Sequence, residues 1–348
     1  MNPIENPMKS CSNEEDDWSQ YAMQLVNISV LPMVLKACME LDVLEIIRQN
    51  TQISPSQIAS QLPCHNPDSA ALMLDKMLSL LASYSILICS ANQAERFYSL
   101  APVSKYFLRN ANGVSLAPLL LANQDKIMID MWYHMKDAVI EGGLPFNRAY
   151  GMDASEYIVK NPSYLQLFKA SMSSYNSMFM EKILETYRGF EGLESIVDVG
   201  GGDGSILKTI VDKYPSIKGI NFDIAPVIAK NDSYPDFMKQ WMLHSWGDDH
   251  CVRILKNCYE ALPEHGKVIV VELVVPEAPE STVDVTSKLQ FDLFMMNMNP
   301  QGKERTETEF NTLARATGFS YGLRSWDNHN PRCRVTWYPP FPDSYDRL

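Results

Sequence analysis

Basic residues are scarce in this sequence, which has 30 Lys and Arg against 42 Asp and Glu and a formal net charge of -12 at pH 7. Binding to nucleic acid or to an anionic membrane requires a basic surface that neutralises phosphates. We therefore expect neither as a partner. A small neutral or cationic ligand fits this charge balance better.

Metal-binding and disulfide patterns are also missing. The cysteines form no CxxC pair, and no histidine lies at zinc-finger spacing from them. We expect reduced thiols and no bound metal. The cysteines are Cys11, Cys38, Cys64, Cys89, Cys251, Cys258 and Cys333.

Targeting and membrane-spanning segments are not visible either. Residues 1–17 are polar and acidic, without the basic start and apolar core of a signal or transit peptide. No apolar run reaches the roughly 20 residues that span a bilayer. We predict a disordered N-terminal segment over residues 1–17 and a cytoplasmic protein.

The length of 348 residues predicts two domains, because single hydrophobic cores stop growing near roughly 250 to 300 residues. Residues 18–112 have a helical pattern followed by a short extended one. The segment Leu25–Leu41 is apolar around most of its circumference, as in a helix buried against another subunit or domain. A capping signature begins at Ser54, and a longer helix is predicted from Asn66 to Leu81.

Two short apolar runs, Ile86–Cys89 and Phe97–Leu100, then predict a hairpin. Helices followed by a two-stranded wing are the layout of a winged helix. DNA binding is one interpretation of that layout, but the acidic charge balance favours a dimerisation or packing role.

Residues 113–190 look entirely helical and carry many methionines and aromatics. At helical spacing such a stripe is typical of a plain core, and it is also compatible with the wall of a ligand site. From residue 191 to 348, short β-branched runs alternate with helical stretches, which predicts a parallel sheet with crossover helices in an α/β fold.

A glycine loop marks the start of this half. The strand candidate Ser195–Val199 runs into Gly200, Gly202 and Gly204, and a helix follows. Such a turn lets the backbone approach a nucleoside closely. The spacing is G-x-G-x-G, whereas a dinucleotide loop needs G-x-G-x-x-G, so a nicotinamide cofactor is disfavoured. Asp223 follows the next strand candidate, where a carboxylate accepts both ribose hydroxyls.

His244 is the candidate base, because its ordinary pKa of about 6.5 suits a general base at neutral pH. It follows a strand-like stretch and precedes a helix expected near Asp248. Ligands of open parallel sheets bind beyond the carboxyl ends of the strands, where His244 would lie. A structural role for this histidine is equally compatible with its position alone.

Three runs carry a resemblance to plant phenolic O-methyltransferases of the caffeic acid and flavonoid type: Val197–Gly202, Leu255–Pro263 and Asn299–Thr306. The likeness extends from about Trp18 to Phe319. It implies a Rossmann-like S-adenosylmethionine methyltransferase domain preceded by a winged-helix-like domain that forms a homodimer.

The resemblance also implies roles for individual residues. His244 is the implied catalytic base, flanked by Glu272 and Glu304, and Lys239 joins the glycine loop and Asp223 in holding S-adenosylmethionine. Ile158 stands where hydroxycinnamate enzymes carry a histidine, which favours a less polar phenol such as a flavonoid or an alkaloid. The implied substrate-binding residues are Asn123, Tyr164, Phe168, Met172, Phe291, Phe294, Met295 and Asn299.

The sequence departs from the family pattern in two places. The interval 224–243 is too short for a full strand, crossover and strand, and the residues that grip the adenine are absent from it. The tail from Tyr321 to Leu348 is rich in proline, which disfavours a central strand. These departures leave an alternative open, a catalytically impaired paralogue or splice form that serves as a dimer subunit.

Overall fold

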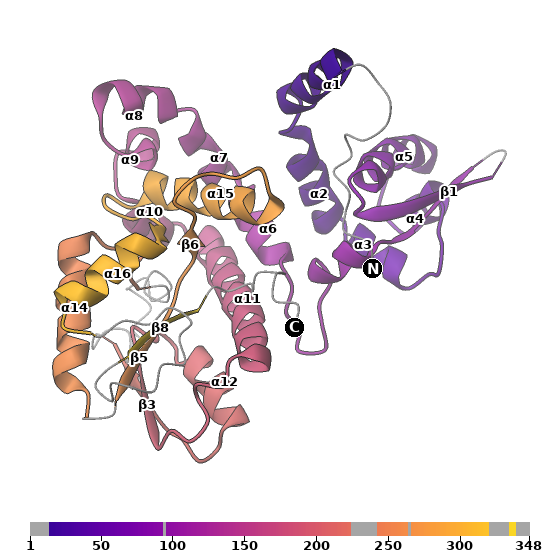
Figure 1. Cartoon of the computed structure of the whole chain (residues 1–348). Coiled ribbons are helices and arrows are strands. Elements are labelled where there is room, and N and C mark those ends of the chain that lie inside the picture. The colour runs from indigo at the N-terminus through magenta and orange to yellow at the C-terminus, as the bar shows by residue number, and fades with distance from the viewer. Residues whose placement is uncertain (1–13, 93–94, 224–241, 264–265, 320–333, 339–348) are drawn as a thin grey trace. The chain divides into compact units, whose positions relative to one another are not determined.

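The computed structural model describes residues 14–92, 95–223, 242–263, 266–319 and 334–338. The chain divides into two compact units, Met1–Gln124 and Asp125–Leu348 (Figure 1). The division falls later than the predicted boundary after residue 112, because helix α6 (Ala117–Asn123) packs on helix α2 (Val30–Glu40) and so belongs to the first unit.

The first unit is helical with one hairpin. Its other elements are α1 (Glu14–Val26), α3 (Val43–Arg48), α4 (Pro55–Ala59), α5 (Pro67–Ser83), β1 (Leu87–Ala91), β2 (Arg96–Leu100) and the 3-10 helix η1 (Pro102–Tyr106).

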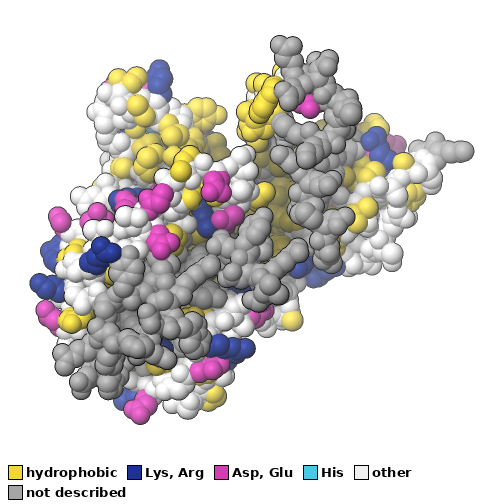
Figure 2. All heavy atoms as spheres, in the orientation of Figure 1, with side chains coloured by type: hydrophobic (Ala, Val, Ile, Leu, Met, Phe, Trp, Pro, Cys, Tyr) yellow, Lys and Arg dark blue, Asp and Glu magenta, His cyan; other side chains and the backbone are white. Residues whose placement is uncertain are grey.

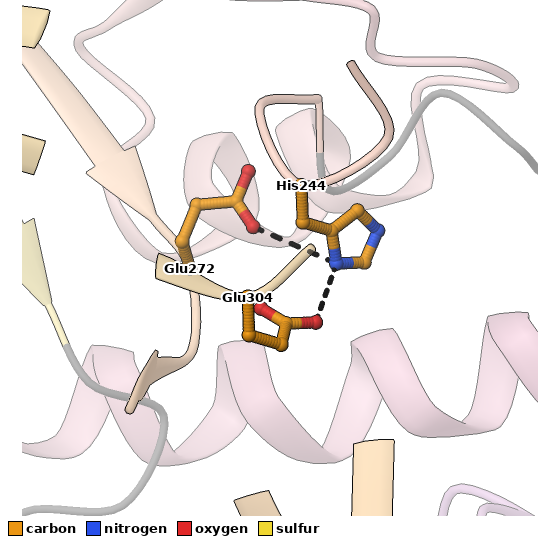
Figure 3. Close-up of side chains that lie close together, drawn as sticks. All are labelled: His244, Glu272 and Glu304. Atoms are coloured by element: carbon orange, nitrogen blue, oxygen red, sulfur yellow. Dashed lines mark hydrogen bonds and ion pairs between the residues drawn. The ribbon is translucent and has the colours of Figure 1, made fainter. Parts of the chain in front are cut away.

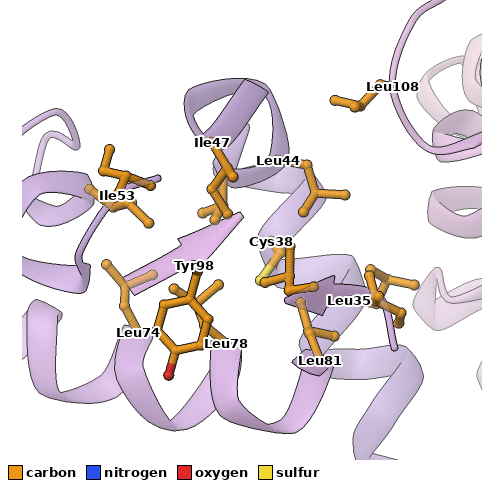
Figure 4. Packing of buried hydrophobic residues seen from close by; sticks show 14 of the residues in the cluster. Leu35, Cys38, Leu44, Ile47, Ile53, Leu74, Leu78, Leu81, Tyr98 and Leu108 are labelled. Carbon is orange, nitrogen blue, oxygen red and sulfur yellow. The ribbon is translucent and has the colours of Figure 1, made fainter. Parts of the chain in front are cut away.

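Local signals in the sequence explain where these elements begin. Ser54 accepts a hydrogen bond from the Gln57 backbone N–H while the Gln57 side chain accepts one from Ser54 N–H, which is a complete capping box. The hairpin pairs β1 with β2 antiparallel, with Leu87 opposite Leu100. Helices and hairpin close over one hydrophobic core in which the Tyr98 ring is fully buried (Figure 4). The predicted winged-helix layout is confirmed.

The sequence suggested a single helix over the apolar stretch Leu25–Leu41, but the structure divides this stretch between two helices. Helix α1 ends at Val26, and α2 begins at Val30. At the break, the Asn27 side chain donates a hydrogen bond to the Met23 carbonyl, 2.9 Å away. A polar side chain that binds the local backbone competes with helix continuation.

The second unit begins with helices that agree with the predicted all-helical stretch. They are α7 (Lys126–Trp132), α8 (Met135–Glu141), α9 (Pro145–Tyr150), α10 (Ala154–Lys160) and α11 (Pro162–Thr186). The remainder alternates strands with helices: β3 (Ser195–Val199), α12 (Ser205–Lys213), β4 (Lys218–Phe222), α14 (Asp248–Ala261), β5 (Lys267–Val271), β6 (Val274–Val275), α15 (Val283–Met298), β7 (Arg305–Thr306), α16 (Glu307–Ala316) and β8 (Arg334–Tyr338).

Strand β5 shows the layering of this unit. Val270 belongs to the hydrophobic cluster formed with α14 and α16, whereas Ile269 and Val271 pack against the cluster of α11 and α12. Successive strand residues point to opposite faces, so both faces of β5 are covered by helices (Figure 1). This arrangement is that of an α/β fold with a parallel sheet.

The strand pairs are parallel, as predicted: β3 with β4, β5 with β8, and β6 with β7. Within the described residues these pairs are separate two-stranded sheets rather than one continuous sheet. The proline-rich tail does contain a strand, β8, whose five residues exclude Pro331 and Pro339. Among the described residues β8 pairs only with β5, so the prediction that the tail is unsuited to a central strand stays a prediction.

Within the described ranges, no single helix combines the length and apolar character needed to cross a membrane. The bent pair Asp17–Val26 and Val30–Glu40 together has the length and composition of a membrane span.

Candidate active site

His244 lies in a turn directly before helix α14. The Leu243 N–H donates to Glu272 Oε1 at 2.7 Å, and the Lys303 N–H donates to the His244 carbonyl at 2.9 Å. The turn is therefore fixed by the segment after β5 on one side and by the segment before β7 on the other.

Glu272 and Glu304 both approach the same nitrogen of His244 (Figure 3). His244 Nδ1 lies 2.8 Å from Glu304 Oε1 and 3.8 Å from Glu272 Oε2. The side chain of His244 is 16% exposed, and those of Glu272 and Glu304 are 2% and 1% exposed. A carboxylate only accepts hydrogen bonds, so the proton of the neutral imidazole lies on Nδ1 and Nε2 is the basic nitrogen.

Charge makes this histidine more basic. Burial alone would lower the pKa of His244, but the nearby carboxylate of Glu272 and the hydrogen-bonded Glu304 outweigh that effect and raise the pKa above 6.5. Burial also raises the pKa of Glu272, which the imidazole and the Leu243 N–H oppose. The cluster is thus an imidazole whose ring is oriented and whose pKa is raised by two glutamate carboxylates.

The same three side chains have ligand atoms of the type that binds metals, all within 4.8 Å of one another. The separation of 2.8 Å between Nδ1 and Oε1 is that of a direct hydrogen bond. The expectation that the site works without a metal therefore remains a prediction.

The glycine loop connects β3 to α12. Gly200, Gly202 and Gly204 all have positive φ, between 56° and 79°, a conformation that side chains disfavour. The Gly200 N–H donates to the Phe222 carbonyl at 2.8 Å, and the Gly202 N–H donates to Asp223 Oδ2 at 3.1 Å. The structure therefore brings together the loop and the carboxylate that the sequence assigned to the same cofactor.

Buried polar groups under this loop fit a polar ligand. In the described part of the chain, Asp198 Oδ2 and Asn221 Oδ1 are buried and have no hydrogen-bond partner. Burial, reinforced by the charge of Asp223, raises the pKa of Asp198 to about 6. Ribose and amino groups are donors that such acceptors can bind.

Asn221 was not predicted, yet its Nδ2 donates to the Gly202 carbonyl at 2.9 Å and holds the loop against β4. Its position two residues before Asp223 could have revealed it, because residues at i and i+2 of a strand share a face.

Four of the predicted substrate residues meet in one hydrophobic cluster of the second unit: Tyr164, Phe168, Met172 and Phe294. Ile158 is fully buried in the same cluster. Phe291 contacts Tyr175 with ring centroids 5.5 Å apart. Burial, together with the charges of Glu304 and Glu272, raises the pKa of Tyr175 well above 10.

The remaining predicted site residues are placed differently. Met295 is half-buried on α15, and its carbonyl accepts from the N–H of Asn299, which follows the helix. Asn123 is the last residue of α6 and belongs to the first unit. Lys239 lies outside the described residues, so its cofactor role stays a prediction.

Family models match most of the chain. An O-methyltransferase domain matches residues 132–240 and 235–320, and an O-methyltransferase dimerisation domain matches residues 23–110. The two pieces of the first match overlap at 235–240, within the shortened interval 224–243.

Two relatives are similar over nearly their whole length. The chain is 51% identical to a caffeic acid 3-O-methyltransferase of Catharanthus roseus, with 89% of this chain and 92% of the relative covered. It is 46% identical to an esculetin O-methyltransferase of Kitagawia praeruptora, with 96% and 97% covered.

Solved structures confirm the predicted fold. Human N-acetylserotonin methyltransferase in complex with S-adenosylmethionine matches with a TM-score of 0.70 at 21% identity, covering 90% of this chain and 94% of that one. A methyltransferase of calicheamicin biosynthesis bound to S-adenosylhomocysteine (SAH) matches with a TM-score of 0.71 at 23% identity, covering 91% of this chain and 97% of that one. The chain belongs to the O-methyltransferase family, whose members are enzymes that use S-adenosylmethionine as the methyl donor.

Proposed function

We propose that this protein transfers the methyl group of S-adenosylmethionine to a hydroxyl oxygen of a small planar phenol, with His244 as the general base. The observation that carries the proposal is the contact of His244 Nδ1 with Glu304 Oε1 at 2.8 Å beside the buried Glu272. This contact orients the ring and leaves Nε2 as the nitrogen that accepts a proton.

The base is needed because a phenol has a pKa near 10 and is mostly protonated at neutral pH. His244 takes the hydroxyl proton at Nε2 as the oxygen becomes nucleophilic. Glu304 and Glu272 stabilise the imidazolium that results, since both are close to Nδ1. The remaining requirement is alignment of the oxygen with the methyl group.

S-adenosylmethionine supplies an electrophilic methyl group on sulfur when it is bound. We assign its ribose to Asp223 and its close backbone contacts to the loop Gly200–Gly204. The buried acceptors Asp198 Oδ2 and Asn221 Oδ1 support this assignment, because they require donors that the described protein does not provide.

The aromatic cluster of α10, α11 and α15 is the proposed site for the phenol ring. Methionine and aromatic side chains contact a flat ring favourably. Ile158 in this cluster provides no polar group for a hydroxycinnamate, so a less polar phenol such as a flavonoid or an alkaloid fits it better. The relatives named for caffeic acid and esculetin make those two phenols the first substrates to test.

We further propose that residues 18–112 form the dimerisation domain of a homodimer, with 113–190 as the substrate-binding part and 191–348 as the Rossmann-like part. Large apolar side chains are exposed along α1 and α2, as Figure 2 shows at the surface of these helices. A monomer rarely exposes such a patch. The residues are Trp18, Tyr21, Met23, Leu25, Val26, Ile28, Val30 and Met33.

Charging this patch is expected to split the dimer. The double variant Val26→Asp/Ile28→Asp places two carboxylates on an interface that is apolar, where unpaired charge is strongly unfavourable. Light scattering after size exclusion should give a dimer mass for the wild type and a monomer mass for the variant. The control Ile88→Asp changes an exposed apolar residue on β1 and should remain dimeric. A dimer that persists in the double variant would refute the assignment of this surface.

The pH profile tests the role of Glu304. The wild-type kcat/KM should rise with pH and level off above the raised pKa of His244, because only the neutral imidazole accepts a proton. Glu304→Gln removes one of the charges that raise that pKa, so the acid limb should move to lower pH and the plateau should fall by about tenfold or more. Glu307→Gln, an exposed neighbour on α16, should leave the profile unchanged. An unmoved acid limb in Glu304→Gln would contradict the proposed pairing.

Incubation of the purified protein with labelled S-adenosylmethionine and caffeic acid, esculetin or a flavonoid tests the function directly. We expect a labelled methyl ether from at least one of these phenols. Calorimetry with SAH separates the rival, a catalytically impaired dimer subunit, which would bind no SAH and form no product. SAH binding without any product from a broad panel of phenols would overturn the phenol assignment alone.

A further inference from the structure

Arg305 is the largest fully buried side chain of the described residues, with 0% exposure, and it follows Glu304 directly in the chain. A buried guanidinium is unfavourable unless its donors are satisfied. Here Nη1 donates to the Leu243 carbonyl at 2.7 Å and Nη2 to the Trp246 carbonyl at 2.7 Å. Nε and Nη2 also donate to Asp248 Oδ1, at 3.0 and 2.8 Å.

The acceptors of Arg305 lie on both sides of His244. Leu243 precedes the histidine, and Trp246 follows it by two residues. One guanidinium therefore spans the whole turn, while Asp248 fixes the guanidinium at the start of α14. The Cys251 thiol donates to the same two carbonyls at 3.3 and 3.5 Å, a weaker contact that cannot replace a charged one.

Glu272 and the guanidinium of Arg305 hold the same residue of this turn, Leu243, one through its N–H and the other through its carbonyl. Glu304 is itself held by Asp292, whose Oδ1 accepts the Glu304 N–H at 2.8 Å. The imidazole, its two acids and Arg305 thus form one network in which each member fixes the next.

We propose that Arg305 is a positioning residue for methyl transfer: its guanidinium holds the 243–246 turn so that His244 keeps its place between Glu272 and Glu304. This inference rests on the proposed role of His244 as the base. Arg305 acts on the reaction only through that turn. A lysine cannot substitute for it, because an ammonium group is compact and lacks the planar fork that reaches two carbonyls and a carboxylate together.

The positive charge of Arg305 also opposes the carboxylates electrostatically. It lowers the pKa of His244, while Glu272 and Glu304 raise it. The other titratable groups around this network in the described residues include Tyr175, Asp248, Cys251, Asp292 and Glu309. Arg305→Lys keeps the positive charge and removes the planar fork. The variant therefore distinguishes the positioning of the turn from the electrostatic effect of the charge on His244.

The test compares Arg305→Lys with Arg253→Lys, a control on the exposed face of α14. We expect Arg305→Lys to lower kcat by about 100-fold, since small displacements of a reacting group have effects of that order. The SAH dissociation constant should change little, and the acid limb should move to lower pH, because a displaced His244 loses part of the carboxylate interaction that raises its pKa. Arg253→Lys should behave like the wild type. A kcat of Arg305→Lys within about twofold of the wild type would overturn the proposal.

A double-mutant cycle shows whether Arg305 works through His244. In a His244→Asn background, adding Arg305→Lys should cause no further loss, because the group that it positions is already gone. A further loss of about 100-fold in that background would overturn the proposal. If Arg305→Lys does not fold, Asp248→Ala loosens the same guanidinium from its exposed partner, and an unchanged kcat there would refute the proposal instead. Retained turnover in the single variant His244→Asn is a different result, because it refutes the proposed role of His244 as the general base and not only the positioning role of Arg305.

Discussion

Replacing His244 with asparagine should lower kcat by about 100- to 10,000-fold, the range that a general base contributes. Asparagine can occupy the same turn and still donate a hydrogen bond to Glu304, but it has no nitrogen that accepts a proton near neutral pH. Binding of SAH should be almost unchanged, because the cofactor loop belongs to the β3–α12 connection and not to this turn. Single-turnover kinetics and calorimetry measure the two quantities separately.

The matched control is His250→Asn, six residues along the chain on the exposed side of α14. Its ring stacks on Trp246 with centroids 5.0 Å apart, and among the described residues it has no carboxylate partner of the kind that His244 has. We expect wild-type kcat from this variant. Full activity in His244→Asn, or an equal loss in His250→Asn, would show that the imidazole of His244 is not the base.

Gly201→Ala should weaken SAH binding by about tenfold or more, because a close approach of the backbone leaves no room for a methyl group. The added Cβ would overlap Asn221 Oδ1 and lie 2.6 Å from Asp198 Oδ2. Neither side chain can turn away easily. Asn221 is tied to the Gly202 carbonyl, and Asp198 is half-buried on β3. The loop must shift instead.

The two variants provide a crossed comparison. Gly201→Ala should raise the SAH dissociation constant, and saturating S-adenosylmethionine should restore much of its rate. His244→Asn should leave the SAH dissociation constant almost unchanged, and saturating S-adenosylmethionine should not restore its rate. Thermal unfolding of both variants shows that each is folded. An unchanged dissociation constant in Gly201→Ala would mean that the glycine turn is not the nucleoside site.

Much of the catalytic half could be predicted from local patterns. The strand before the glycine loop, the helix after it and Asp223 are all consecutive in the chain, so spacing alone located them. Glu272 could be placed because it ends a clear apolar strand. These features depend on neighbours in sequence, which is the information that a single sequence carries best.

Contacts between distant residues could not be predicted from patterns. Arg305 binds carbonyls near residue 243 because β7 lies beside that turn, and no periodicity reveals such a neighbour. The pairing of β8 with β5 is a similar case, since the prolines of the tail disfavoured a central strand and no local pattern indicated that the five residues between them pair with β5. The break between α1 and α2, where the Asn27 side chain donates to the Met23 carbonyl, interrupts an apolar pattern that by itself predicts a single helix.

The carboxylates at the glycine loop also affect which molecule stays bound. Asp223 accepts from the loop and Asp198 Oδ2 is buried beneath it, while Glu272 and Glu304 lie beside the proposed base, His244. A sulfonium carries a positive charge that the thioether left after transfer does not. An acidic environment therefore attracts the reactant more than the spent product, and this difference favours exchange of one for the other after each cycle.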